Sequence, residues 1–190
     1  MQLAFYFDQT RCIGCYTCVV ACKDWYDIPA GPVSWRRVLT IERGKYPKLF
    51  VAFLSLSCFH CAQPACVAVC PVGAISKRKE DGIVVVRGDA CLGKTSCGLC
   101  FEACPYGAPQ FAAEEDAPMQ KCNFCLERWA EGKKPVCVAG CPTRALDAGP
   151  IEEMEERYGK VREAAGFTYD EKVRPAVVFR PKPQVPVAAF

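Results

Sequence analysis

The chain has 190 residues, with 24 lysines and arginines against 21 aspartates and glutamates, which gives a net charge of +3. This near balance gives no indication of a nucleic-acid partner or of a strongly anionic one, and the length accommodates one or two domains. Sixteen cysteines stand beside a single histidine, His60, so cysteine chemistry dominates the composition.

The first predicted element is a strand over Ala4–Phe7, followed by a cysteine loop and a short helix over Thr17–Ala21. Residues Met1–Asp8 have neither a basic start nor a long apolar segment, so we expect no secretory signal peptide. Gly14 lies inside the loop, where the absence of Cβ lets the backbone approach a cofactor. The spacing Cys-x-x-Cys-x-x-Cys-x-x-x-Cys is the ferredoxin ligand pattern, formed here by Cys12, Cys15, Cys18 and Cys22.

The same order of strand, cysteine loop and short helix recurs twice in the middle of the chain. Strands are expected over Phe50–Leu54 and Ile83–Val86, and helical turns over Ala65–Val69 and Gly98–Ala103. A proline follows the last cysteine of each group and ends the turn, because it fixes φ and has no N–H. The two groups are Cys58, Cys61, Cys66 and Cys70, and then Cys91, Cys97, Cys100 and Cys104.

A fourth group and a C-terminal region complete the chain. We expect a helical turn over Val136–Gly140 and a charged helix over Ile151–Glu163. The proline-rich tail, Val173–Phe190, is expected to be extended, with little structure of its own, and to dock on a partner. The apolar positions at helical spacing in the charged helix are Ile151, Met154, Tyr158 and Val161. The cysteines of the fourth group are Cys122, Cys125, Cys137 and Cys141.

Four groups of four cysteines predict four 4Fe–4S clusters with all sixteen thiolates as ligands. Each of the four irons in a cubane needs one outer thiolate, and two-residue gaps let the chain curl round one face with three of them. The fourth thiolate must come from elsewhere. Apolar residues between the ligands are expected to exclude water, namely Val19, Val20, Val67, Val69 and Phe101.

Other uses of the cysteines fit less well. Disulfides are typical of exported chains, and zinc sites usually combine two Cys-x-x-Cys pairs. A Rieske centre needs two histidines, so His60 is expected at the surface or behind the ligands. We interpret Lys77–Lys79 as a solvated turn, and the three tryptophans as packing residues: Trp25, Trp35 and Trp129.

Catalysis and membrane insertion have no signal in the sequence. We find no nucleophile–base pair and no glycine-rich phosphate loop. The longest apolar stretch, Val51–Phe59, is far shorter than the roughly 20 residues that a spanning helix needs. Any membrane attachment is therefore expected through another subunit.

Several stretches resemble the iron–sulfur electron-transfer subunit of the dimethyl sulfoxide reductase type. Related subunits serve polysulfide, thiosulfate, nitrate and formate oxidoreductases of the molybdenum or tungsten bis-pterin class. The resemblance covers roughly Phe5 to Tyr158. The matching stretches are Cys12–Asp24, Ser57–Cys66, Ala103–Gln110, Lys121–Cys125, Ala130–Pro135 and Cys141–Asp147.

The resemblance implies an α+β, loop-rich fold of two ferredoxin-like double-cluster modules with short strands and helices. The outer module takes residues 1–48 and 113–150, the inner one takes 49–112, and a C-terminal helix and extended docking tail take 151–190. The implied ligand sets are Cys12, Cys15, Cys18 with Cys141; Cys122, Cys125, Cys137 with Cys22; Cys58, Cys61, Cys66 with Cys104; and Cys91, Cys97, Cys100 with Cys70.

One departure from the family lies in the third group. Five residues, Leu92–Ser96, separate Cys91 from Cys97, where the family usually has two. All four cysteines are kept, but the longer loop leaves the exposure and potential of that cluster open.

These observations predict a non-catalytic subunit that relays single electrons, as in anaerobic respiration. Its expected partners are a large molybdenum or tungsten pterin catalytic subunit and a membrane anchor subunit or soluble carrier. We expect a cytoplasmic protein, or one folded in the cytoplasm and exported with a signal-bearing partner. The alternative is a free-standing or polymerising polyferredoxin that serves several enzymes. A catalytic iron–sulfur enzyme would need an open iron site, and sixteen cysteines for sixteen irons leave none.

Overall fold

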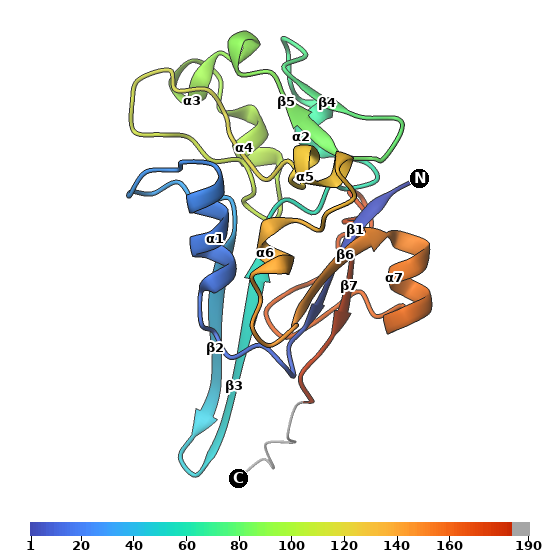
Figure 1. The fold of residues 1–190 in the computed structure, drawn as a ribbon. Helices are drawn as coiled ribbons and strands as arrows, with labels where there is room; N and C mark the ends of the chain where they lie inside the picture. Colours follow the sequence, from blue (N-terminus) through green and yellow to red (C-terminus); the bar gives the residue numbers. More distant parts are fainter. Residues whose placement is uncertain (184–190) are drawn as a thin grey trace.

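The computed structural model describes residues 1–183 and has a mixed α/β, loop-rich architecture (Figure 1). The helices are α1 (Thr17–Trp25), α2 (Ala65–Ala68), α3 (Gly93–Ser96), α4 (Leu99–Ala103), α5 (Leu126–Ala130), α6 (Val136–Ala139) and α7 (Ile151–Tyr158), with a 3₁₀ turn at Gly88–Ala90. The strands are β1 (Leu3–Asp8), β2 (Arg37–Lys45), β3 (Lys48–Leu56), β4 (Ile75–Lys77), β5 (Val84–Val86), β6 (Leu146–Pro150) and β7 (Val177–Arg180). The α+β prediction is confirmed. Within residues 1–183, no helix is long and apolar enough to cross a bilayer.

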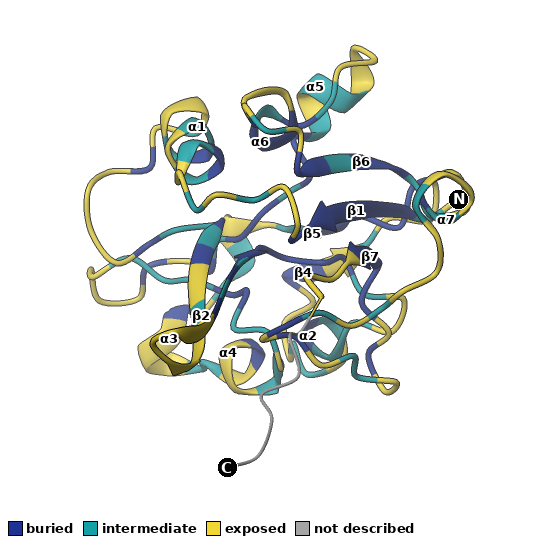
Figure 2. Ribbon diagram, turned by 90° about the horizontal axis from the view of Figure 1, so that it is seen from below, coloured by how far each residue is buried: buried dark blue, intermediate teal, exposed yellow. Residues whose placement is uncertain are grey.

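Strand β1 is the centre of the main sheet, whose order is β6-β1-β7. It pairs antiparallel with β6 and parallel with β7, and all its residues are buried (Figure 2). Because strand side chains alternate between faces, Phe5 and Phe7 belong to the large core beside the cysteines. Ala4 and Tyr6 belong to a smaller core under α7.

Helix α7 is shorter than the sequence predicts. It ends at Tyr158 because Gly159 has a φ of +86°, outside the helical region. Met154 is fully buried, and the ring of Tyr158 stacks on Tyr6 with centroids 3.7 Å apart. The expectation that Val161 belongs to this helix face is wrong, since Val161 lies beyond the helix and is exposed.

The expectation that the tail has little structure of its own is also wrong for its first half. Residues Val177–Arg180 form β7, and the side chains of Val177, Val178 and Phe179 are fully buried. This segment packs on its own subunit because β1 presents a free edge and Phe167 and Phe7 contact Phe179. Residues 184–190 of the expected docking tail lie outside the described residues.

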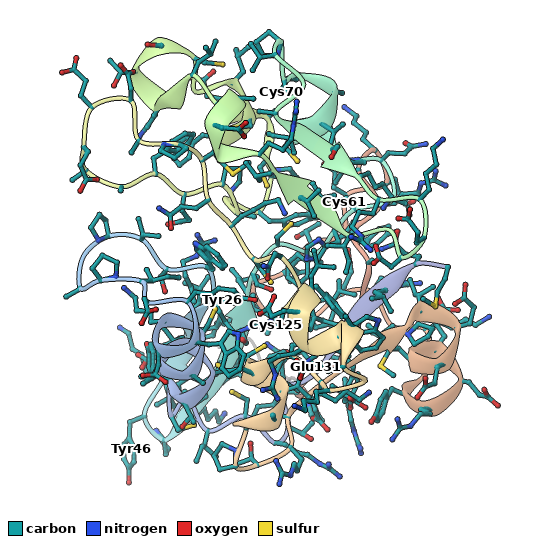
Figure 3. The ribbon with its side chains drawn as sticks, turned by 45° about the horizontal axis from the view of Figure 1, so that its top comes forward. Tyr26, Tyr46, Cys61, Cys70, Cys125 and Glu131 are labelled. Carbon is teal, nitrogen blue, oxygen red and sulfur yellow. The ribbon has the colours of Figure 1, made fainter. Side chains whose placement is uncertain are left out.

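Strands β2 and β3 form a long hairpin that extends from the body (Figure 1). Strand β3 is the one predicted from its apolar run. Its partner, β2, is not predicted because its sequence is polar. Tyr46, at the tip, points away from the protein (Figure 3). Near the base, Phe53 packs against Gly14 of the first cysteine loop. A Cβ on Gly14 would lie 2.4 Å from the Phe53 ring, so the close approach that requires glycine is to this ring.

The loop groups meet in pairs. Helix α1 contacts α6, and α2 contacts α4, so the first group lies against the fourth and the second against the third (Figure 1). The division into an outer module of residues 1–48 and 113–150 and an inner module of residues 49–112 stays a prediction.

Replacing Gly14 by alanine should distort the first cysteine loop. The positive φ of +69° alone costs about 1–2 kcal/mol for a residue with Cβ, and the Phe53 ring adds a steric clash. We expect a larger loss in the free energy of unfolding, measured by urea denaturation, than for Gly73→Ala, whose φ is +61° with nothing within 4 Å of the added Cβ. Adding Phe53→Ala should cost less in Gly14→Ala than in wild type. Additive effects would contradict the contact.

Candidate iron–sulfur sites

All sixteen cysteines are free thiols, and eight of them line two small cavities. One cavity is lined by Cys58, Cys61, Cys66 and Cys104, three cysteines of the second group and the last of the third. Another is lined by Cys70, Cys91, Cys97 and Cys100, the reverse combination. Cys61 and Cys70 mark these two neighbouring regions in Figure 3. The arrangement has the reciprocal form that the family resemblance implies.

The first and fourth groups meet in the same reciprocal way. The evidence is the effect that their thiols have on one another's pKa. Burial raises the pKa of Cys12, and the thiols of Cys18, Cys141 and Cys15 raise it further. Burial likewise raises the pKa of Cys22 to about 12, and its strongest thiol neighbours are Cys137 and Cys125. Thus Cys141 lies with the first group, and Cys22 lies with the fourth.

The four sets also adjoin one another. The thiols of Cys141 and Cys137 both raise the pKa of Cys18. The thiol of Cys58 raises the pKa of Cys122, and the thiol of Cys100 raises the pKa of Cys66. The sets therefore follow each other in one line, from the loop of Cys12 to the loop of Cys91.

The donor chemistry fits a polynuclear cluster better than zinc. Thiolates bound to one zinc at about 2.3 Å would lie roughly 3.8 Å apart. Within residues 1–183, no group of three or more His, Cys, Asp or Glu side chains is arranged to hold a single metal ion. Burial raises the pKa of Cys66 to about 12 and of Cys100 to about 11. These thiols would therefore carry protons before a cluster binds, and cluster binding would release them.

Backbone amides approach several ligand sulfurs. The N–H of Ala108 donates to Cys104 Sγ over 3.5 Å, and the N–H of Ala145 donates to Cys141 Sγ over 3.3 Å. Both donors stand four residues after the cysteine in a Cys-Pro-x-x-Ala sequence. Hydrogen bonds to cluster sulfurs raise the reduction potential. This repeated Cys-Pro-x-x-Ala pattern is a signal that our sequence analysis did not use.

Buried cations stand behind the cysteines, and sequence reasoning missed them. Arg36 is 2% exposed and Lys121 is 4% exposed. Lys121 Nζ donates to the carbonyl oxygens of Val84 and Cys122 and lines the cavity of Cys58. Neither cation forms an ion pair with a carboxylate in the described part of the chain. No periodicity distinguishes such residues from surface charges.

His60 is not at the surface, contrary to one of the two places expected for it. The side chain is 1% exposed, and its Nδ1 accepts a hydrogen bond of 3.0 Å from the Val84 N–H. Nε2 therefore carries the proton of the neutral ring, and no partner for it lies among the described residues. Burial keeps the pKa of His60 well below its usual range, and Lys121, Lys77 and Arg36 lower it further.

Lys77 is not a solvated residue either. Its Nζ donates to Gln2 Oε1 at 2.7 Å, to the Cys61 carbonyl at 2.8 Å and to the Gly82 carbonyl at 2.9 Å. It thereby ties the second cysteine loop to the N-terminus and to the β4–β5 turn. The following Arg78 pairs with Asp81 at 3.0 Å, as suits a turn at the surface.

The expected packing roles of the tryptophans hold for two of the three. Trp35 and Trp129 pack partly buried against the main core. Trp25 is exposed, and its indole N–H donates to Glu127 over 2.8 Å. Tyr26 donates to the same carboxylate at 2.7 Å, and Cys125 lies beside it in Figure 3.

The expected shielding of the clusters by apolar residues is only partly right. Val19, Val67 and Val69 are half-buried, but Val20 is 63% exposed and Phe101 is 42% exposed. Both face outward because short helices carry them on the side opposite the ligands. In the inserted loop, Gly93–Ser96 form α3, and Lys94 Nζ lies 4.5 Å from the Phe101 ring centroid.

Comparisons with known proteins agree with this geometry. A family model described as a 4Fe–4S dicluster domain matches residues 49–151, and one described as a 4Fe–4S binding domain matches residues 3–24. The chain is 46% identical to a probable anaerobic dimethyl sulfoxide reductase component, YnfG, of Escherichia coli strain K12 and 45% identical to the B subunit of anaerobic dimethyl sulfoxide reductase from the same strain. Each alignment covers 95% of this chain and 89% of the relative.

A formate dehydrogenase iron–sulfur subunit of Wolinella succinogenes is 41% identical, over 80% of this chain and 84% of that protein. The alignments with the two Escherichia coli proteins cover nearly the whole chain, including the regions that the two family models match. The chain therefore belongs to the 4Fe–4S electron-transport family of iron–sulfur oxidoreductase subunits of the dimethyl sulfoxide reductase type.

Proposed function

We propose that this chain relays single electrons through four 4Fe–4S clusters, between a molybdenum or tungsten pterin catalytic subunit and a quinone-linked membrane subunit or soluble carrier. The observation that carries the proposal is the line of four reciprocal cysteine sets. Each set combines three cysteines of one group with one from another, which is the ligand arrangement of two-cluster ferredoxins.

The assignment of ligands follows the cavities and the thiol neighbours. The proposed sets are Cys12, Cys15, Cys18 and Cys141; Cys22, Cys122, Cys125 and Cys137; Cys58, Cys61, Cys66 and Cys104; and Cys70, Cys91, Cys97 and Cys100. A bound cubane supplies a site that gains and loses one electron. The residues of this chain hold the clusters, exclude water and donate hydrogen bonds to sulfur.

The chain itself is proposed to be non-catalytic. Every iron of four cubanes would be bound by one of the sixteen thiolates, which leaves no open iron for a substrate. The names of the relatives support a catalytic partner, since they are components of reductases and dehydrogenases. The pterin metal and the second partner are parts of the proposal.

A free-standing polyferredoxin is the alternative. Affinity purification of the tagged chain from anaerobically grown cells separates the two functions. We expect a large pterin-containing chain in fixed stoichiometry. Recovery of the loaded chain alone would favour the polyferredoxin.

The purified protein should contain about sixteen iron and sixteen sulfide per chain, because four cubanes carry four of each. Inductively coupled plasma spectrometry and a sulfide assay measure both. About eight iron in fully reconstituted protein, or stoichiometric zinc, would overturn the assignment of four clusters.

The reciprocal sets can be tested by exchanging one ligand at a time. Cys141→Ser should change the same electron paramagnetic resonance signal as Cys18→Ser, since both thiols are assigned to one cluster. Cys22→Ser should instead match Cys137→Ser. A Cys141→Ser spectrum that matches Cys137→Ser would show that each loop supplies all four of its own ligands.

A further inference from the structure

Arg36 carries a positive charge into the main core without a carboxylate partner. Its guanidinium donates to Ser55 Oγ at 3.0 Å and to Ser57 Oγ at 3.1 Å, and it lies 4.7 Å from the centroid of the Phe5 ring. No ion pair of Arg36 occurs among residues 1–183. Two hydroxyls and a ring do not neutralise a cation, and burying an unpaired charge is strongly unfavourable. A negatively charged group near Arg36 would therefore stabilise its buried charge.

The groups that most strongly favour this positive charge are cysteines of two different sets, in their ionised form. Burial opposes the guanidinium charge, yet the pKa of Arg36 is raised overall by Cys137, Cys18, Cys122 and Cys22. Cys18 belongs to the first set, and the other three belong to the second. Cys137 is the cysteine with the largest effect on Arg36, and Arg36 in turn lowers the pKa of Cys137. Arg36 thus lies at the junction of the two sets.

Ser55 extends this contact to a ligand sulfur. Its Oγ accepts from Arg36 and lies 3.7 Å from Cys18 Sγ. Because the serine oxygen is already used as an acceptor, its own proton is free to point at the Cys18 sulfur. Arg36 is therefore linked to the first set through Ser55 and acts on the second set electrostatically, most strongly on Cys137.

We propose that Arg36 is a positioning residue that supplies one shared, fixed counter-charge to the two clusters held by the first and fourth cysteine groups. The inference rests on the proposed function. Reduction adds an electron to an anionic cluster, and a cation held in a medium of low dielectric stabilises the reduced form. Arg36 raises both reduction potentials and weakens the repulsion between two adjacent anionic centres.

The other two sets have different surroundings, so the effect is selective. Lys121 is the cation with the largest effect on Cys66, and Lys77 interacts with Cys61 and Cys58, whereas Arg36 is not among the largest effects on Cys61, Cys66 or Cys104. The largest side-chain effects on the pKa of Cys100 come from other cysteines, Cys91, Cys97 and Cys70. Lys94, in the inserted loop beside it, lies over the exposed Phe101 ring.

The test is a redox titration of the loaded protein, followed by electron paramagnetic resonance and by iron analysis. In Arg36→Gln, we expect the equilibrium constant for reduction to fall at least tenfold for the two outer clusters, which is about 59 mV for one electron. The midpoint potential of the Cys100 cluster should not change. Arg36→Lys, which keeps the charge, should recover most of the loss.

Arg43→Gln is the matched control. It removes the same formal charge from an exposed position of β2, and its potentials should equal those of wild type. Ser55→Ala provides a second measurement should Arg36→Gln fail to bind its full iron. It should lower the midpoint potential of the cluster that contains Cys18 and leave the one that contains Cys137 unchanged.

Three results would overturn the role of Arg36: unchanged potentials in Arg36→Gln, an equal shift of all clusters, or an unchanged Cys18 cluster in Ser55→Ala. An equal loss in Arg36→Lys would also do so, since it would separate the effect from the charge. Failure of the proposed function has another signature, because wild-type protein would then lack the two outer signals before any substitution is made.

Discussion

The antiparallel register of two strand pairs decides which cysteines can meet. Strand β1 runs into the first cysteine loop, and β6 begins just after the fourth. Their ladder pairs Phe7 with Leu146, and the Asp8 N–H donates to the Ala145 carbonyl over 2.8 Å. The beginning of the first loop is therefore held opposite the end of the fourth, which brings Cys141 to the first group.

The small β4–β5 sheet repeats this device in the middle of the chain. Strand β4 follows Cys70 closely, and β5 shortly precedes Cys91. Ile75 pairs with Val86, so the end of the second loop lies beside the beginning of the third. At both places the last cysteine of one loop thus lies with cysteines of another loop, and backbone hydrogen bonds between the strands hold the two loops together. A slip by one residue would turn the side chains of a strand to the opposite face.

Much of this arrangement is predictable from spacing and composition, and some of it is not. Strands β1, β3 and β5 and helices α1, α2, α4 and α6 lie where apolar runs and cysteine spacing predict them, because these signals are local. Strand β2 has a polar sequence and depends on its partner. From its sequence, strand β7 resembles an unstructured proline-rich tail. It forms because it pairs with the edge of β1, which is distant in the sequence, so no local pattern predicts it.

The same distinction separates the ligands from the groups behind them. Sixteen cysteines are visible because only a few uses account for their spacing. Arg36, Lys121 and His60 are ordinary polar residues in the sequence. Their burial becomes evident only when β2, β3 and the fourth loop close around them. The cysteine groups are thus evident from the sequence, whereas their electrostatic surroundings become evident only from the packing.

Exposure changes along the line of sets in a way that suits electron transfer. The set in the middle of the line that belongs to the fourth group includes the buried Cys122 and Cys137, near the buried Arg36. At one end, Cys15 is exposed between Ile13 and Val20, which are both largely exposed. At the other end, the cavity of Cys70, Cys91, Cys97 and Cys100 is rimmed by exposed apolar side chains, namely Val72, Leu92 and Leu99.

Exposed apolar groups beside a redox centre are costly in water and are stabilised when a partner covers them. Under the proposed function, electrons enter and leave at these two ends, because a thiol set approaches the surface through an apolar rim at each of them. The middle of the line has the opposite requirement. Its charges must be neutralised internally, and Arg36 and Lys121 lie where no partner can supply a counter-charge.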